Sequence, residues 1–85
     1  MWYVYVLYSM SGGRSYVGYS NDVERRLFEH NVSESRGFTK RYRPWELIHQ
    51  ECFDLKSAAM ARERYLKNGR GRVEVKEMVS RWLNR

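Results

Sequence analysis

Glu63 is an acidic residue placed where a carboxylate could bind a metal ion or pair with a cation. Apolar side chains stand four positions before it and three after it, so on a helix it should face the body of the protein. A carboxylate that leaves water needs a compensating positive charge. That charge is either a divalent cation or a basic residue of the same stretch, namely Arg62, Arg64 or Lys67.

Arg26 and His30 lie one helical turn apart in a stretch whose apolar positions, Val23 and Leu27, predict an amphipathic helix. His30 lies on the apolar face and Arg26 at its edge, where a guanidinium can reach into a cleft. The planar guanidinium matches the geometry of phosphate, and an imidazole can exchange a proton near neutral pH. The alternatives are a solvated arginine and a histidine that only forms a hydrogen bond within the fold.

Tyr5 and Tyr16 lie in two successive stretches, rich in aromatic and β-branched residues, that predict neighbouring strands. If the register of these strands places both rings on one face, their hydroxyl groups could converge near Glu63. A tyrosine has an ordinary pKa of about 10 and is a poor base at neutral pH unless a cation or a metal-bound water assists it. The alternative is that both are ordinary sheet aromatics, since the chain has seven tyrosines.

These residue types match the needs of phosphodiester hydrolysis. That reaction requires a deprotonated water, positive charge on the phosphoryl oxygens, a way to neutralise the leaving oxygen and a substrate held in line. A metal ion held by one carboxylate, with water and phosphate in the rest of its shell, meets the second and third needs. The chain therefore offers one candidate for each role.

The first third of the chain predicts a β-hairpin followed by a helix. Residues 2–8 are apolar at nearly every position and predict a central strand. Residues 10–14 have turn chemistry, and residues 15–19 predict a second strand. Asn21 is the expected N-cap of the helix, with Glu24 at the capping-box position, and the helix should run to about residue 31.

The rest of the chain predicts one strand and two helices. Residues 32–44 predict a basic loop, and residues 45–53 predict a strand at a sheet edge. Asp54 can cap the next helix, which Gly69 should stop. A terminal amphipathic helix is marked by apolar residues at helical spacing: Val75, Val79, Trp82 and Leu83. The element order ββαβαα predicts an α+β fold, a three-stranded antiparallel sheet flanked by helices.

Two tripeptides and three later residues resemble the two-part signature of the GIY-YIG nuclease superfamily. The first triplet of the signature appears as Tyr3-Val4-Tyr5 and the second as Tyr16-Val17-Gly18, so both signature tyrosines are present while a tyrosine replaces the first glycine. Arg26 follows the second tyrosine by ten residues, His30 follows four later, and Glu63 lies on a later helix. The chain is similar to small stand-alone members that resemble the amino-terminal domain of excinuclease C.

The resemblance implies a metal-dependent DNA endonuclease that leaves 5′-phosphate and 3′-hydroxyl ends, with a role in DNA repair. It implies that Glu63 binds Mg²⁺ or Mn²⁺ and that Arg26 stabilises negative charge on the scissile phosphate. It implies that Tyr5 and Tyr16 position the water and help to deprotonate it, with Tyr16 the favoured residue. His30 would share water activation or phosphate contact.

The resemblance covers about residues 2–68 and departs from the family in two respects. The late active-site asparagine has no assigned counterpart, since Asn68 follows the helix of Glu63 and Asn84 is nearly terminal. Larger members join this domain to a DNA-binding or second nuclease domain, whereas residues 1–85 are expected to form a single domain. Specificity would then come from a protein partner, from dimerisation or from DNA shape, and we expect a monomer or weak dimer.

Sixteen lysines and arginines against ten acidic residues give a net charge of +6, so the chain should attract polyanions. Nucleic acid is the commonest such partner of a small basic domain, although ribosomal and membrane-surface proteins have a similar balance. We expect DNA rather than RNA. The basic residues expected to contact its backbone are Arg36, Lys40, Arg41, Arg43, Lys67, Arg70 and Arg72.

Cys52 is the only cysteine and has no Cys or His companion at zinc-ligand spacing, so it is expected to be a small buried residue. No charged-then-apolar leader opens the chain, and no apolar run approaches the ~20 residues that a membrane span requires. We therefore expect a cytoplasmic protein without membrane contact.

Two other functions fit the same sequence. A non-catalytic nucleic-acid-binding module that keeps the fold is favoured by the unassigned asparagine and the lack of a second domain. A basic ribosome-associated or structural protein would bind without Mg²⁺, and Glu63→Ala would only tighten its binding slightly. The ordered set of tyrosines, arginine, histidine and glutamate favours the enzyme, since a pure binder has no need of an inward-facing carboxylate.

Overall fold

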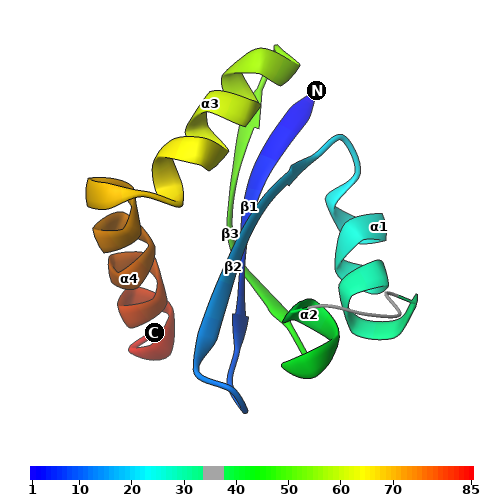
Figure 1. Cartoon of the computed structure of the whole chain (residues 1–85), viewed down its shortest axis with the longest axis vertical. Helices are drawn as coiled ribbons and strands as arrows, with labels where there is room; N and C mark the ends of the chain where they lie inside the picture. Colours follow the sequence, from blue (N-terminus) through cyan, green and yellow to red (C-terminus); the bar gives the residue numbers. More distant parts are fainter. Residues whose placement is uncertain (34–37) are drawn as a thin grey trace.

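The computed structural model describes residues 1–33 and 38–85 of the chain. Its centre is an antiparallel sheet with the strand order β2-β1-β3, in which β1 spans Trp2–Ser9, β2 Arg14–Ser20 and β3 Glu46–Phe53 (Figure 1). The apolar stretch at the start of the chain is the central strand, as predicted. Within the part of the chain that the structure describes, the outer edges of β2 and β3 have no strand partner.

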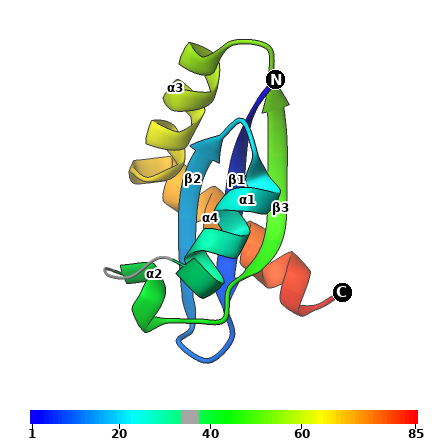
Figure 2. The same ribbon diagram turned by 90° about the vertical axis from the view of Figure 1, so that its right-hand side faces the viewer.

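Helices cover both faces of the sheet, which confirms the predicted α+β class. On one face lie α1 (Val23–Phe28), a π-helical turn η1 (Glu29–Ser33) that continues it, and the short α2 (Phe38–Arg41) (Figures 1 and 2). On the other face lie α3 (Lys56–Leu66) and α4 (Gly69–Leu83). Among the described residues, α2 was not predicted from the sequence and lies within the predicted basic loop. No helix of the described residues is long and apolar enough to cross a membrane.

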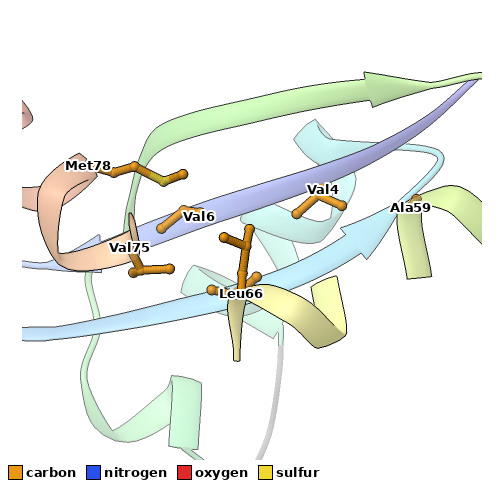
Figure 3. Close-up of a cluster of buried hydrophobic side chains, with 7 residues drawn as sticks. Val4, Val6, Ala59, Leu66, Val75 and Met78 are labelled. Atoms are coloured by element: carbon orange, nitrogen blue, oxygen red, sulfur yellow. The ribbon is translucent and has the colours of Figure 1, made fainter. Parts of the chain in front are cut away.

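Each face of the sheet has its own apolar core because side chains alternate along the strands. The core beneath α3 and α4 is made of seven buried residues, six of them labelled in Figure 3: Val4, Val6, Val17, Ala59, Leu66, Val75 and Met78. The core beneath α1 contains Tyr5, Leu7, Val23 and Trp45. The sheet is therefore the shared wall of two small cores.

Both predicted helix caps were wrong. Asp22, not Asn21, is the N-cap of α1, and its Oδ1 accepts a hydrogen bond of 3.0 Å from the backbone N–H of Arg25. The helix starts one residue later than expected because β2 extends to Ser20, whose hydroxyl accepts from the Asp22 N–H. α3 starts after Leu55 without a side-chain cap, so Asp54 does not fill that role.

Two further details differ from the sequence predictions. α3 ends at Leu66, and Gly69 opens α4 with a positive φ of 48°, so this glycine serves the bend between the helices rather than stopping the first one. Cys52 is exposed, not buried. It pairs with Tyr3 on the face of β3 that turns away from α3 and α4, at the unpaired edge of the sheet.

Arg62 ties the outer layer to the sheet. Its Nε and one terminal nitrogen donate to the Glu51 carboxylate of β3 at 2.8 and 3.0 Å, and the same terminal nitrogen donates to Glu74 of α4 at 2.9 Å. One guanidinium on α3 thus joins β3, α3 and α4. Its neighbour in sequence is Glu63, so this network also fixes the rotation of α3 that aims Glu63.

We expect Arg62→Gln to lower the free energy of unfolding at pH 7 by about 1 kcal/mol, because partly exposed ion pairs are screened by solvent. Arg62 holds the pKa of Glu51 below its ordinary value. A lowered pKa stabilises the fold above the unfolded-state pKa of about 4.3, and that contribution is lost as the pH falls through the folded-state pKa. Urea unfolding should therefore show a difference between the two proteins that shrinks on acidification.

The matched control is Arg81→Gln, which removes an exposed arginine of α4 that forms no ion pair within the described residues. Its unfolding free energy should follow the unmodified protein at every pH. A difference for Arg62→Gln that stayed constant between about pH 7 and about pH 3 would contradict the role of Glu51.

Candidate active site

The ring of Tyr5 lies across β2 at Gly18 and reaches the helix beyond it. The strand register pairs these two residues, and a Cβ atom at Gly18 would stand only 2.5 Å from the Tyr5 hydroxyl oxygen and 2.6 Å from its Cζ. The Tyr5 hydroxyl forms a hydrogen bond of 3.1 Å with Nε2 of His30. The Tyr5 ring therefore occupies the space that a side chain at position 18 would need.

Tyr5 is a protonated phenol at neutral pH. Burial raises its pKa to about 12, and Tyr16 and Glu63 add to the rise, while Arg26 works in the opposite direction. Because the hydroxyl keeps its proton and is hydrogen-bonded to His30, Tyr5 is suited to orient other groups rather than to accept a proton.

Tyr16 lies between the two sides of the site. It shares a sheet face with Tyr5, since it pairs with Leu7 two residues further along β1, and their ring centroids are 6.3 Å apart. The ring centroid of His30 is 4.8 Å away, and Nζ of Lys67 lies 5.8 Å from the Tyr16 centroid. The ring of Tyr16 therefore lies between His30 on the α1 side of the sheet and Lys67 at the end of α3. Tyr16 is half-buried, so it remains partly open to solvent.

Arg26 is both anchored and accessible. Its guanidinium forms an ion pair with Glu29 three residues later, and its side chain is 28% exposed. Partial burial works against the charged form, but hydrogen bonds to Glu29 and Tyr5 raise the pKa of Arg26 above its ordinary value. The residue therefore presents a permanent positive charge beside the Tyr5 hydroxyl.

Glu63 points inward but has a basic partner. Its side chain is 19% exposed, and Oε2 lies 3.0 Å from Nζ of Lys67, one turn further along α3. Of the two compensating charges that the sequence allowed, the structure contains the ion pair with Lys67. The carboxylate is also near enough to Tyr5 for its charge to raise the pKa of that phenol, so it faces the tyrosine side of the molecule.

A metal ion at this place would have one protein carboxylate. No group of three or more His, Cys, Asp or Glu side chains could hold a metal among residues 1–33 and 38–85. Glu63 nevertheless fits the role, because it is mostly shielded and already balances a cation, and Mg²⁺ commonly keeps several waters beside one or two carboxylates. The metal would replace the ammonium of Lys67.

The basic residues expected to contact nucleic acid fall on both sides of this site. Lys40 and Arg41 are exposed on α2, and Arg70 is exposed at the start of α4. Arg43 donates from Nε to the carbonyl of His30 at 2.6 Å, so it also supports the backbone of η1. Arg36 lies outside the described residues.

Sequence reasoning missed the residues that hold η1 against the sheet. The Asn31 side chain accepts a hydrogen bond of 2.6 Å from the Trp45 N–H and donates one of 2.9 Å to the Trp45 carbonyl. The Trp45 indole N–H donates to the carbonyl of Thr39 at 2.6 Å, and the ring is buried. These bonds place His30, the residue before Asn31. An asparagine followed by a distant tryptophan gives no local signal for such a contact.

The three-stranded sheet and its flanking helices have the fold of a small GIY-YIG domain. A family model described as the GIY-YIG catalytic domain matches residues 1–76. The chain therefore belongs to the GIY-YIG family.

Individual relatives agree with this membership. A UPF0213 protein of Haloquadratum walsbyi is 46% identical over 66 residues, which are 78% of this chain and 73% of that protein. One from Natronomonas pharaonis is 48% identical over 66 residues, 78% of this chain and 76% of that protein. The solution NMR structure of a UPF0213 protein from Bacillus halodurans has a TM-score of 0.52 and 33% identity, covering 94% of this chain and 84% of that one.

Gly18→Ala should lower the free energy of unfolding by about 1–3 kcal/mol, because the new methyl group overlaps the Tyr5 ring. Urea unfolding in a double-mutant cycle with Tyr5→Leu measures the coupling. We expect the alanine to cost clearly less when the ring is absent. Equal costs in the two backgrounds would mean that Gly18 is required for a reason other than the passage of Tyr5.

Proposed function

We propose that this protein is a metal-dependent endonuclease that hydrolyses phosphodiester bonds in DNA. The observation that carries the proposal is the meeting of Tyr5, Tyr16 and His30 beside Arg26, with hydrogen-bond and ring distances of 3.1 to 6.3 Å. Glu63 supplies an inward-facing carboxylate on the other side of Tyr16, linked to it through Lys67. Membership of a nuclease family supports the same conclusion.

Arg26 is suited to hold the scissile phosphate. Its charge is permanent, its fork can bind two phosphoryl oxygens, and these contacts strengthen as negative charge builds in the transition state. Glu29 holds the guanidinium beside the Tyr5 hydroxyl before substrate arrives. The free-energy cost of orienting the Arg26 guanidinium is therefore incurred when the protein folds, not when the substrate binds.

Tyr16 is better placed than Tyr5 to position the attacking water. Tyr5 is buried and its hydroxyl is bonded to His30, whereas the half-buried ring of Tyr16 remains open to solvent. Water attacks phosphorus and passes one proton to Tyr16 or His30, the bond between phosphorus and the 3′ oxygen breaks, and that oxygen takes up a proton from solvent, which produces a 5′-phosphate and a 3′-hydroxyl. A Mg²⁺ ion held by Glu63 would supply positive charge for the phosphoryl and leaving oxygens.

A non-catalytic nucleic-acid-binding module is the second candidate. The observation that favours it is the ion pair between Glu63 and Lys67, since a carboxylate already neutralised by an ammonium has no unmet need for a metal. In either case we propose that a protein partner or the shape of the DNA supplies specificity.

The test is cleavage of supercoiled plasmid and of a labelled flap duplex with Mg²⁺, Mn²⁺ or EDTA. We expect metal-dependent nicking that falls by at least about 10²-fold in both Glu63→Ala and Arg26→Ala, as for loss of a group that stabilises transition-state charge. Glu77→Ala and Arg81→Ala remove exposed residues of the same charges from α4 and should keep full activity. Binding of DNA without cleavage, with an affinity unchanged by Glu63→Ala, would contradict the nuclease proposal and favour the non-catalytic nucleic-acid-binding module.

Lys67→Met should lower the Mg²⁺ concentration needed for half-maximal nicking about fivefold, because the metal no longer competes with an ammonium whose exposed ion pair is worth about 1 kcal/mol. Lys56→Met, an exposed lysine at the opposite end of α3, is the control. A Mg²⁺ requirement that did not move would show that Lys67 and the metal do not share Glu63.

A further inference from the structure

A hollow lies between the outer edge of β2 and the α3–α4 pair, next to the candidate active site. Its volume is about 380 Å³, at the lower end of the range of small-ligand pockets. Its apolar floor comes from Val17 of β2, Leu66 of α3 and Val75 of α4, three residues of one core cluster. Figure 3 shows the last two side chains next to each other beside β2.

The rim of the hollow is cationic. Lys67, Arg72 and Lys76 line it, from the end of α3 and the first turns of α4. The structure contains no carboxylate paired with Arg72 or Lys76 among the residues that it describes, and both are exposed. An apolar floor beneath unneutralised cations suits a ligand with a flat or apolar body and an anionic end.

Lys67 and Tyr16 connect this hollow to the candidate active site. Both residues line the hollow, and both belong to the site, Lys67 through its ion pair with Glu63 and Tyr16 through its contacts with Tyr5 and His30. Tyr16 thus borders both the hollow and the group formed by Tyr5, His30 and Arg26.

We propose that the hollow binds a single unpaired nucleotide next to the scissile phosphate, its phosphate on Arg72 and Lys76 and its sugar or base against the apolar floor. This inference rests on the proposed nuclease function. It defines the substrate class as nucleic acid in which one nucleotide beside the cut lies outside a double helix.

The size of the hollow argues against an intact duplex. A double helix keeps its bases stacked, and proteins that hold a single base in a pocket take it out of the stack at a cost of a few kcal/mol. That cost is smallest for a nucleotide that is already unpaired. The hollow therefore favours a flap, a gap or a strand end over continuous duplex.

Binding can be measured without cleavage. Titration of the full chain with deoxyadenosine 5′-monophosphate, followed by NMR, should shift the signals of Val17, Leu66 and Val75. Arg72→Ala/Lys76→Ala should weaken this binding about tenfold, as expected when two exposed cations lose a phosphate. Lys56→Ala/Arg81→Ala removes the same charge elsewhere and should bind as the unmodified protein does.

A strand and a free nucleotide are distinguished by competition. A 5′-phosphorylated trithymidylate should displace the mononucleotide and bind more tightly than it does. If the trinucleotide leaves the mononucleotide in place, the hollow is a site for free nucleotides and the proposal is overturned. Shifts confined to residues outside the hollow overturn it as well.

Cleavage then tests the position of the nucleotide. The unmodified protein should cut a flap with one unpaired nucleotide much faster than continuous duplex. The ratio of the two rates should fall toward one in Arg72→Ala/Lys76→Ala and stay unchanged in Lys56→Ala/Arg81→Ala. An unchanged ratio in that variant overturns the inference and leaves the nuclease standing. Nucleotide binding at the hollow with no cleavage of any substrate rejects the nuclease, and the hollow remains a nucleotide site.

Discussion

The passage of Tyr5 over Gly18 is the contact on which the candidate site depends. Strand pairing alone would leave the Tyr5 hydroxyl beneath β2, and only a residue without a Cβ allows the ring to cross and reach His30. The same contact buries the phenol and keeps its proton. The absence of a Cβ at Gly18 therefore permits both the hydrogen bond between Tyr5 and His30 and the burial that raises the pKa of the Tyr5 phenol.

The edge of β2 is where the two sides of the molecule meet. The sheet separates α1 from α3 and α4, so in the proposed site the side chains of Arg26 and Glu63 come from opposite faces of the sheet, on either side of β2. Tyr16 bridges the gap, with His30 on one side and Lys67 on the other. A domain this small can form a two-sided site because its sheet is only as wide as three strands.

The features that could be predicted from the sequence are those that depend on local residue patterns and on the order of helices and strands along the chain. The apolar run of β1, the hairpin and the inward direction of Glu63 follow from periodicity. The cap at Asp22, the exposure of Cys52 and the clamp between Asn31 and Trp45 do not, because each depends on where a neighbouring element ends or on a contact across the fold. The ion pair of Lys67 with Glu63 was predicted only as one of two alternatives. Helical spacing allows this ion pair, but it does not distinguish it from a metal ion bound to Glu63.

The clamp between Asn31 and Trp45 limits how far a change in chain length can disturb His30. The clamp joins the two ends of the stretch between η1 and β3, and Arg43 near the end of that stretch donates to the His30 carbonyl, so these three residues together hold the backbone at His30. The entropy of closing a loop rises only slowly with its length. A change in the length of that stretch that leaves Arg43 and Trp45 in place should therefore disturb His30 little.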